Sequence, residues 1–178
     1  MKTLSFGQPM GGIIQEAHVV PDLKAAALQW SRTLGIGPFF IFDHFPLFDA
    51  QYRGQPAEFD VSLALAFSGN MCFELIQQNN DAPSVYREVV AKRGYGFHHW
   101  AIATDDFDKS LRDYGAEGYD LALYGVAGVG ARAAYMDTYD ALGGMIELIE
   151  MTPKTEEFFG LLHEAAINWD GKDPLRTL

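Results

Sequence analysis

The chain has little of several features that define whole classes of protein. A single cysteine, Cys72, excludes an intramolecular disulfide and favours a reducing, cytoplasmic location. No apolar run reaches the length of about 18 residues that is typical of a membrane span. The first residues also lack the apolar segment of a secretory signal. We therefore expect a cytoplasmic protein without a membrane partner.

Positive charge is also scarce. Thirteen Lys and Arg residues stand against 24 Asp and Glu, which gives a formal net charge of −11 in 178 residues. Such a chain is repelled by the phosphates of nucleic acids, so we expect no nucleic-acid partner. The hydrophobic share of 48% and the charged share of 21% are ordinary for a globular protein.

Two segments of the chain follow one plan. In the first, a strand over 13–20 precedes Asp22, a natural helix N-cap, and then a helix. In the second, a strand over 97–104 precedes a cap at Asp105 or Asp106 and a further helix. Glycines close both helical patterns, as is common at helix ends. The agreement predicts a duplicated module.

The later parts of the two segments match as well. The sequences "CFELI" and "MIELI" each place a glutamate, Glu74 or Glu147, inside an otherwise apolar strand. Each is preceded by another strand-like run, at 61–67 in one segment and at 131–137 in the other. Each module therefore has the predicted order strand–helix–strand–strand–strand.

The predicted architecture is a single α+β domain over 1–178. Its two βαβββ modules form a curved, barrel-like mixed sheet around a shared site. The predicted divisions are module one at about 11–78, a connector at 79–95, module two at about 96–151, and a C-terminal helix and tail at 152–178.

The adjacent histidines of "GFHHWAIATDD" raise the question of which one faces the shared site. Counting seven residues back from Asp22 gives Gln15, and counting seven back from Asp106 gives His99. Side chains alternate along a strand, so Gln15 and His99 are expected on the inner face. By the same alternation, we expect His98 on the opposite face, which packs under the module's helix.

Four polar side chains then occupy related places in the two modules: Gln15, Glu74, His99 and Glu147. A lone strand glutamate is usually solvent-facing, and a lone histidine is usually structural. The same interruption in both modules instead favours a buried site, where carboxylates need a compensating partner or metal. Two carboxylates, an imidazole and an amide oxygen suit zinc, nickel, cobalt, manganese or iron(II).

The stretches "VVPDLKAAALQWSRTLGIGPF", "FELIQ", "GFHHWAIATDDFDKSL" and "GGMIELIE" resemble the vicinal-oxygen-chelate superfamily. This superfamily includes glyoxalase I, methylmalonyl-CoA epimerase, extradiol dioxygenases and bleomycin-resistance proteins. The resemblance implies a glyoxalase-like fold with metal ligands on the first and last strand of each module, at Gln15, Glu74, His99 and Glu147. These residue types are similar to those of some glyoxalase I enzymes. Methylmalonyl-CoA epimerase typically has His in the first position and Gln in the second, where this chain departs from it.

The function predicted from the resemblance is that of a metal-dependent lyase, isomerase or epimerase. A small carbonyl or thioester substrate would react through a metal-stabilised enolate. Glu147 is the expected catalytic base and Glu74 the opposing catalytic carboxylate. Curved sheets of this type often pair between chains, so we also expect a homodimer.

Two other functions remain open. A metal-free binding protein of the resistance type would use the aromatic stretch 37–54 as a pocket wall, although core packing also explains that stretch. An iron(II) ring-cleaving dioxygenase would need two histidines and one carboxylate. Only His99 is in register for such a set, because His18 is expected to face away and His44 to lie in a solvent-facing loop.

Overall fold

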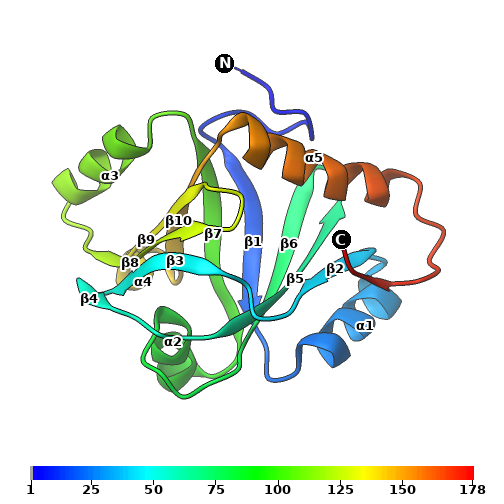
Figure 1. Cartoon of the computed structure of the whole chain (residues 1–178), viewed down its shortest axis with the longest axis horizontal. Coiled ribbons are helices and arrows are strands. Elements are labelled where there is room, and N and C mark those ends of the chain that lie inside the picture. The colour runs from blue at the N-terminus through cyan, green and yellow to red at the C-terminus, as the bar shows by residue number, and fades with distance from the viewer. Residues whose placement is uncertain (1) are drawn as a thin grey trace.

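The computed structural model describes residues 2–178 and contains one 11-stranded sheet (Figure 1). The strands are β1 (Ile13–Val19), β2 (Phe39–Phe42), β3 (Leu47–Tyr52), β4 (Gln55–Pro56), β5 (Val61–Ser68), β6 (Met71–Gln78), β7 (Gly96–Thr104), β8 (Leu121–Ala127), β9 (Arg132–Met136), β10 (Met145–Glu150) and β11 (Leu175–Arg176). The helices are α1 (Leu23–Leu34), α2 (Val85–Arg93), α3 (Phe107–Ala116), α4 (Tyr139–Leu142) and α5 (Pro153–Ile167).

The order of strands shows the duplication. The order is β11-β2-β5-β6-β1-β7-β10-β9-β8-β3-β4, so β1 and β7 lie side by side at the centre. These two strands are antiparallel, and each is parallel to the last strand of its own module, β6 or β10. The sheet is mixed, curved and unclosed. The predicted α+β fold with two βαβββ modules is confirmed.

Helix capping follows the sequence pattern. Asp22 Oδ1 accepts a hydrogen bond from the Ala25 N–H at 2.9 Å, and α1 ends at Gly35, whose φ of 68° is left-handed. Of the two candidate caps in module two, Asp106 is the one whose carboxylate accepts from the Lys109 N–H, at 3.0 Å. Both helices therefore begin directly after the first strand of their module.

Module one contains a hairpin that was not predicted from the sequence. It consists of β3 and β4, within the connection between β2 and β5, and its strand β3 pairs with β8 of module two. Leu47 lies over Gly125 of β8, where a Cβ atom would overlap the Leu47 Cγ atom. The missing side chain of Gly125 therefore allows β3 to close onto module two.

Helices cover both faces of the sheet. On the convex face, Leu23 and Ala27 of α1 pack with Leu75 of β6, and Phe107 of α3 packs with Leu148 of β10. On the concave face, α5 covers one end and α2 the other, at the top and bottom of Figure 1. The middle of the concave face lies between these two helices.

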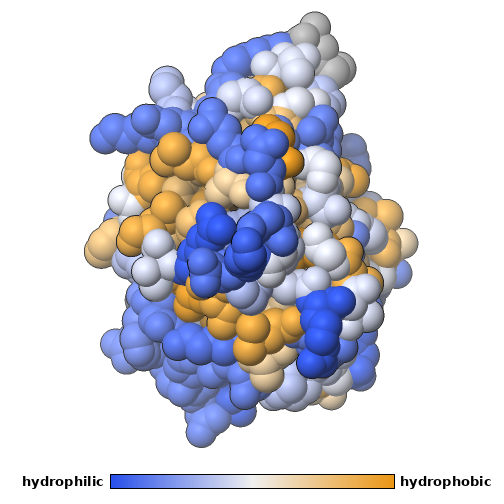
Figure 2. All heavy atoms as spheres, turned by 90° about the vertical axis from the view of Figure 1, so that its right-hand side faces the viewer, coloured by the Kyte–Doolittle hydropathy of each residue, from blue (hydrophilic) through white to orange (hydrophobic). Residues whose placement is uncertain are grey.

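The side of the molecule that bears α1 and the end of α5 is drawn in Figure 2. Apolar patches on it are separated by hydrophilic side chains. Exposed apolar residues of these helices include Leu28, Leu34, Leu161 and Ile167. Within residues 2–178, no helix is long and apolar enough to cross a membrane. The homodimer and the cytoplasmic location stay predictions.

Candidate metal centre

Four adjacent strands bring the polar residues of both modules to the middle of the concave face. In the order β6, β1, β7 and β10, these strands carry Glu74, Gln15, His99 and Glu147. All four side chains are buried, with exposed fractions between 0% for His99 and 7% for Glu147. The structure therefore brings together all four residues that the repeat register had selected.

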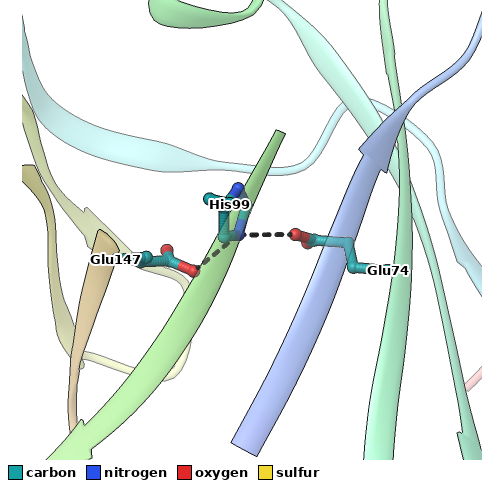
Figure 3. Close-up of side chains that lie close together, drawn as sticks. All are labelled: Glu74, His99 and Glu147. Carbon is teal, nitrogen blue, oxygen red and sulfur yellow. Dashed lines mark ion pairs between the residues drawn. The ribbon is translucent and has the colours of Figure 1, made fainter. Parts of the chain in front are cut away.

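Three of these side chains point at a common region (Figure 3). His99 Nε2 lies 3.1 Å from Glu147 Oε2 and 3.5 Å from Glu74 Oε2. One ligand atom from each residue can be chosen so that all lie within 4.8 Å of one another. The fourth residue, Gln15, donates a hydrogen bond from Nε2 to Glu74 Oε2 at 2.9 Å. The arrangement is a compact cluster of nitrogen and oxygen atoms.

Small side chains lie beside the polar residues on the two central strands. Ala17 of β1 and Ala101 of β7 are fully buried on the same face as the four polar residues. Their packing partners lie toward α2 and α5 respectively. The strand alternation that placed Gln15 and His99 on the inner face is confirmed for both residues.

The prediction for His98 is wrong, and the reason is a β-bulge. In the pairing of β1 with β7, Ala17 lies opposite His99 and His18 lies opposite Phe97, so His98 is an extra residue. A bulge interrupts alternation locally. His98 consequently turns away from the α3 side and is fully buried, with Nδ1 2.9 Å from His99 Nδ1 and Nε2 3.3 Å from the Val85 carbonyl oxygen of α2.

These contacts define the tautomers of both histidines. Burial, together with neighbouring His99, holds the pKa of His98 well below its usual value, so His98 is neutral near pH 7. The Val85 carbonyl can only accept, so the proton of His98 is on Nε2 and its Nδ1 accepts from His99 Nδ1–H. With Nδ1 of His99 donating in this bond, Nε2 is the ring nitrogen that can offer a lone pair. Within residues 2–178 this buried atom has no hydrogen-bond partner.

The cluster is rich in electron-pair donors. Burial raises the pKa of Glu74 well above its usual value, and the nearby Glu147 raises it further, while the hydrogen bond from Gln15 opposes both. Two carboxylates and an imidazole lone pair thus converge in a buried place. Such a group is costly unless protons or a cation supply positive charge.

The donor set fits a divalent cation. Metal–ligand distances of about 2.0–2.2 Å place neighbouring ligand atoms about 3–4 Å apart, and the two distances at His99 Nε2 are 3.1 and 3.5 Å. Imidazole with carboxylates suits zinc, nickel, cobalt, manganese and iron(II). Glu74, His99 and Glu147 could therefore hold a metal ion. Ligation by Gln15 stays a prediction, because its amide nitrogen faces Glu74.

A cavity of about 340 Å³ adjoins the cluster, and we call it the chamber. Gln15, Glu74 and Glu147 line its buried end. Its other walls come from β2, the β2–β3 connection, β3, the connection before β5, β5, α2, β8, the β8–β9 turn, β9, β10 and α5. These walls include Phe42, Phe45, Pro46, Leu47, Phe59, Val61, Leu63, Leu65, Tyr86, Leu123, Val129, Tyr135, Ile149, Phe158 and Phe159.

The aromatic stretch 37–54 has a divided role. Phe39 and Phe40 belong to the core, whereas Phe42 and Phe45 line the chamber. The wall formed by α5, with Phe158 as a member, was not predicted from the sequence. No sequence signal indicated which part of the sheet the terminal helix covers.

The remaining histidines of the sequence analysis lie outside the cluster. His18 Nε2 lies 2.9 Å from Glu16 Oε1, and its ring packs against Trp30. His44 is exposed and pairs with Asp60 at 2.7 Å. Neither joins His99 to form the two-histidine set of a ring-cleaving iron enzyme.

A protein-family model matches this chain. The model for the glyoxalase/bleomycin resistance protein/dioxygenase superfamily matches residues 15–137, which is more than half of the chain. This chain belongs to that superfamily. Comparison with curated proteins gave no significant match.

Solved structures support the same fold. A hypothetical protein from Bacillus halodurans is 19% identical with a TM-score of 0.58, over 79% of this chain and 94% of that chain. Methylmalonyl-CoA epimerase from Mycobacterium tuberculosis is 21% identical with a TM-score of 0.57, over 86% and 93%. A Streptomyces coelicolor methylmalonyl-CoA epimerase variant in complex with 2-nitronate-propionyl-CoA is 19% identical with a TM-score of 0.56, over 82% and 97%. At these identities the likeness establishes the fold alone.

Proposed function

We propose that this chain is a metal-dependent enzyme of the lyase, isomerase or epimerase type. Its substrate is a small carbonyl or thioester compound, and Gln15, Glu74, His99 and Glu147 hold the divalent cation. The observation that carries the proposal is the buried His99 Nε2, which has no hydrogen-bond partner within residues 2–178 and faces two carboxylates. Membership of the superfamily supports the same interpretation.

The proposed chemistry is proton transfer next to a carbonyl group. When bound, a divalent cation supplies a Lewis acid that polarises the substrate oxygen and favours negative charge on it. Glu147 removes the proton, because no hydrogen bond within residues 2–178 holds its carboxylate, whereas Gln15 holds Glu74. Glu74, across His99 from Glu147, is the opposing carboxylate. Base catalysis of this kind contributes roughly 10²- to 10⁴-fold.

His98 is the proposed positioning residue of the centre. Its Nδ1 accepts the Nδ1–H of His99 and thereby keeps the lone pair of His99 Nε2 directed at the two carboxylates. Second partners of this kind orient a metal-ligating histidine and raise its basicity. His98 itself touches neither carboxylate in the hydrogen bonds described above.

Metal analysis tests the first part of the proposal. Protein purified without chelator should contain about one divalent ion per chain by plasma mass spectrometry, and dialysis against a chelator should remove it. Protein that neither retains nor rebinds a cation would contradict the metal-dependent function. That result would favour the alternative, a metal-free small-molecule binding protein, which the apolar chamber supports.

Glu147→Gln tests the second part. We expect this variant to fold but to lose metal-dependent exchange of the proton next to a carbonyl group. The readout is deuterium incorporation into a panel of hydroxycarbonyl compounds and thioesters, measured by NMR. The matched control is Glu150→Gln, on the same strand but paired with Arg132 away from the centre. Exchange at the wild-type rate in Glu147→Gln would remove Glu147 from its role.

A further inference from the structure

Beyond the candidate metal centre, the chamber offers little charge to a ligand. Its lining is mainly apolar, and in the part of the chain that the structure describes it includes one cationic side chain, Arg132. The acidic members are Glu74 and Glu147 at the buried end and Asp43 in the β2–β3 connection. An anionic group on a ligand would therefore meet either an apolar wall or one of these three acids.

Arg132 is already fully engaged by protein groups. Its Nη1 lies 2.8 Å from Asp108 Oδ1, and its Nη2 lies 2.7 Å from Glu150 Oε1. The guanidinium carbon is 4.5 Å from the ring centre of Phe107, which packs on the convex face of the sheet. Its charge is thus directed away from the chamber, and two carboxylates neutralise it.

The walls favour a compact apolar group. A volume of about 340 Å³ is near the lower end of the range of about 300–1,000 Å³ that is typical of small-molecule sites. The rings of Phe42, Phe45 and Phe158 form part of the wall, with Phe158 packed against Phe42 at 5.6 Å between ring centres. Aromatic walls of this kind favour a ring or a branched hydrocarbon over a polar chain.

We propose that the substrate is a neutral compound with a ring-bearing apolar body and two adjacent oxygens, and without a phosphate or carboxylate tail. The oxygens rest on the proposed function, because they face the cation at the buried end, and the body fills the chamber. This substrate class differs from the CoA thioester named with the Streptomyces coelicolor epimerase. The net charge of −11 also disfavours a phosphate-bearing ligand.

Two hydroxamic acids with the same chelating oxygens test the proposal on zinc-loaded protein. Benzohydroxamic acid carries a ring and acetohydroxamic acid a methyl group, and calorimetry gives both Kd values. We expect benzohydroxamic acid to bind at least about tenfold more tightly, because transfer of its phenyl ring from water into the apolar chamber is favourable. Acetyl-CoA should not displace it. Phe158→Ala and Phe45→Ala should each reduce the ratio of the two affinities, whereas Phe48→Ala should not, because Phe48 lies outside the chamber and is 59% exposed.

The outcomes separate this inference from the proposed function. If zinc binds but the two hydroxamic acids bind equally, or acetyl-CoA binds more tightly, the substrate class is wrong and the metal centre stands. If zinc does not bind, the metal-dependent function fails. Fluorescence of N-phenyl-1-naphthylamine then tests whether the chamber of the metal-free protein binds a ring-bearing apolar group. A fluorescence that Phe158→Ala or Phe45→Ala lowers, and that Phe48→Ala does not lower, supports binding of such a group in the chamber. Absence of binding in wild type overturns it.

Discussion

The two modules share one backbone irregularity but fill it with different residues. In both β1 and β7, the residue before the first site residue is an extra one in the pairing of the two strands: Ile14 before Gln15, and His98 before His99. Both extra residues are fully buried. Ile14 packs in the apolar cluster beneath α5, whereas His98 bonds to His99 and to α2.

This difference shows how a duplicated fold acquires an asymmetric site. The bulge is a property of the backbone in both halves, and it directs one additional side chain to the concave face. In module one that side chain adds apolar burial, and Gln15 bonds directly to Glu74. In module two it supports an imidazole whose Nδ1 has no other hydrogen-bond partner among residues 2–178. Under the proposed function, we therefore expect the second module to contribute more to metal binding.

The largest expected effect contrasts the first site residue of each module. His99→Ala should weaken zinc binding by more than about 100-fold, beyond the 10- to 100-fold typical of residues that only support a ligand. Gln15→Ala should weaken it less than about tenfold, because Gln15 offers only a neutral amide oxygen and its amide nitrogen already bonds to Glu74. Competition with a chromophoric chelator measures both. Equal losses in the two variants would show that the modules contribute alike.

The next largest effect is expected for a variant that gives module two the same type of bulge residue as module one. His98→Ile should weaken zinc binding by about 10- to 100-fold, because Ile cannot accept the Nδ1–H of His99. His98→Asn should recover most of this loss, since its side-chain oxygen can accept near the place of Nδ1. A loss in His98→Asn as large as in His98→Ile would leave His98 with a packing role only.

A smaller effect concerns the hairpin that only module one has. Gly125→Ala should lower the free energy of unfolding by about 1–3 kcal/mol, because the new methyl group overlaps Leu47. In the background of Leu47→Ala, the same change should cost much less. Urea unfolding of the four proteins gives the coupling. If the effects of Gly125→Ala and Leu47→Ala on the free energy of unfolding were additive, the new methyl group would not clash with Leu47, and β3 would shift without strain.

The smallest effect concerns Glu150, which corresponds to Gln77 in module one when Glu74 and Glu147 are aligned. Hydrogen bonds from Arg132 hold the pKa of Glu150 below its usual value. The pair therefore stabilises the fold above the unfolded pKa of about 4.3, and this contribution is lost as pH falls through the lower folded pKa. Glu150→Gln should cost less than about 1 kcal/mol at pH 7, because the pair is partly exposed.

Urea unfolding between pH 3 and pH 7 measures this difference. The wild type and Glu150→Gln should converge at the acidic end. A difference that persists unchanged at pH 3 would assign the effect to packing rather than to the charge of Glu150.

Much of the fold and the four site residues followed from comparing one half of the sequence with the other. Glu74 and Glu147 stood out because each interrupts an apolar strand at the same place in its module. His98 was predicted on the wrong face of the sheet because strict alternation of side chains does not allow for a β-bulge. The β3–β4 hairpin was missed because it occurs in one module, so no second copy marked it.

The position of the cluster across the seam between β1 and β7 has a consequence for folding. Gln15 and Glu74 come from the N-terminal half, and His99 and Glu147 come from the C-terminal half. A bound cation would act as a non-covalent cross-link between chain segments that are synthesised far apart in time. The cation could then bind only after both halves of the chain had folded together. Its binding would raise the unfolding temperature, and this increase would grow with the logarithm of the free-ion concentration.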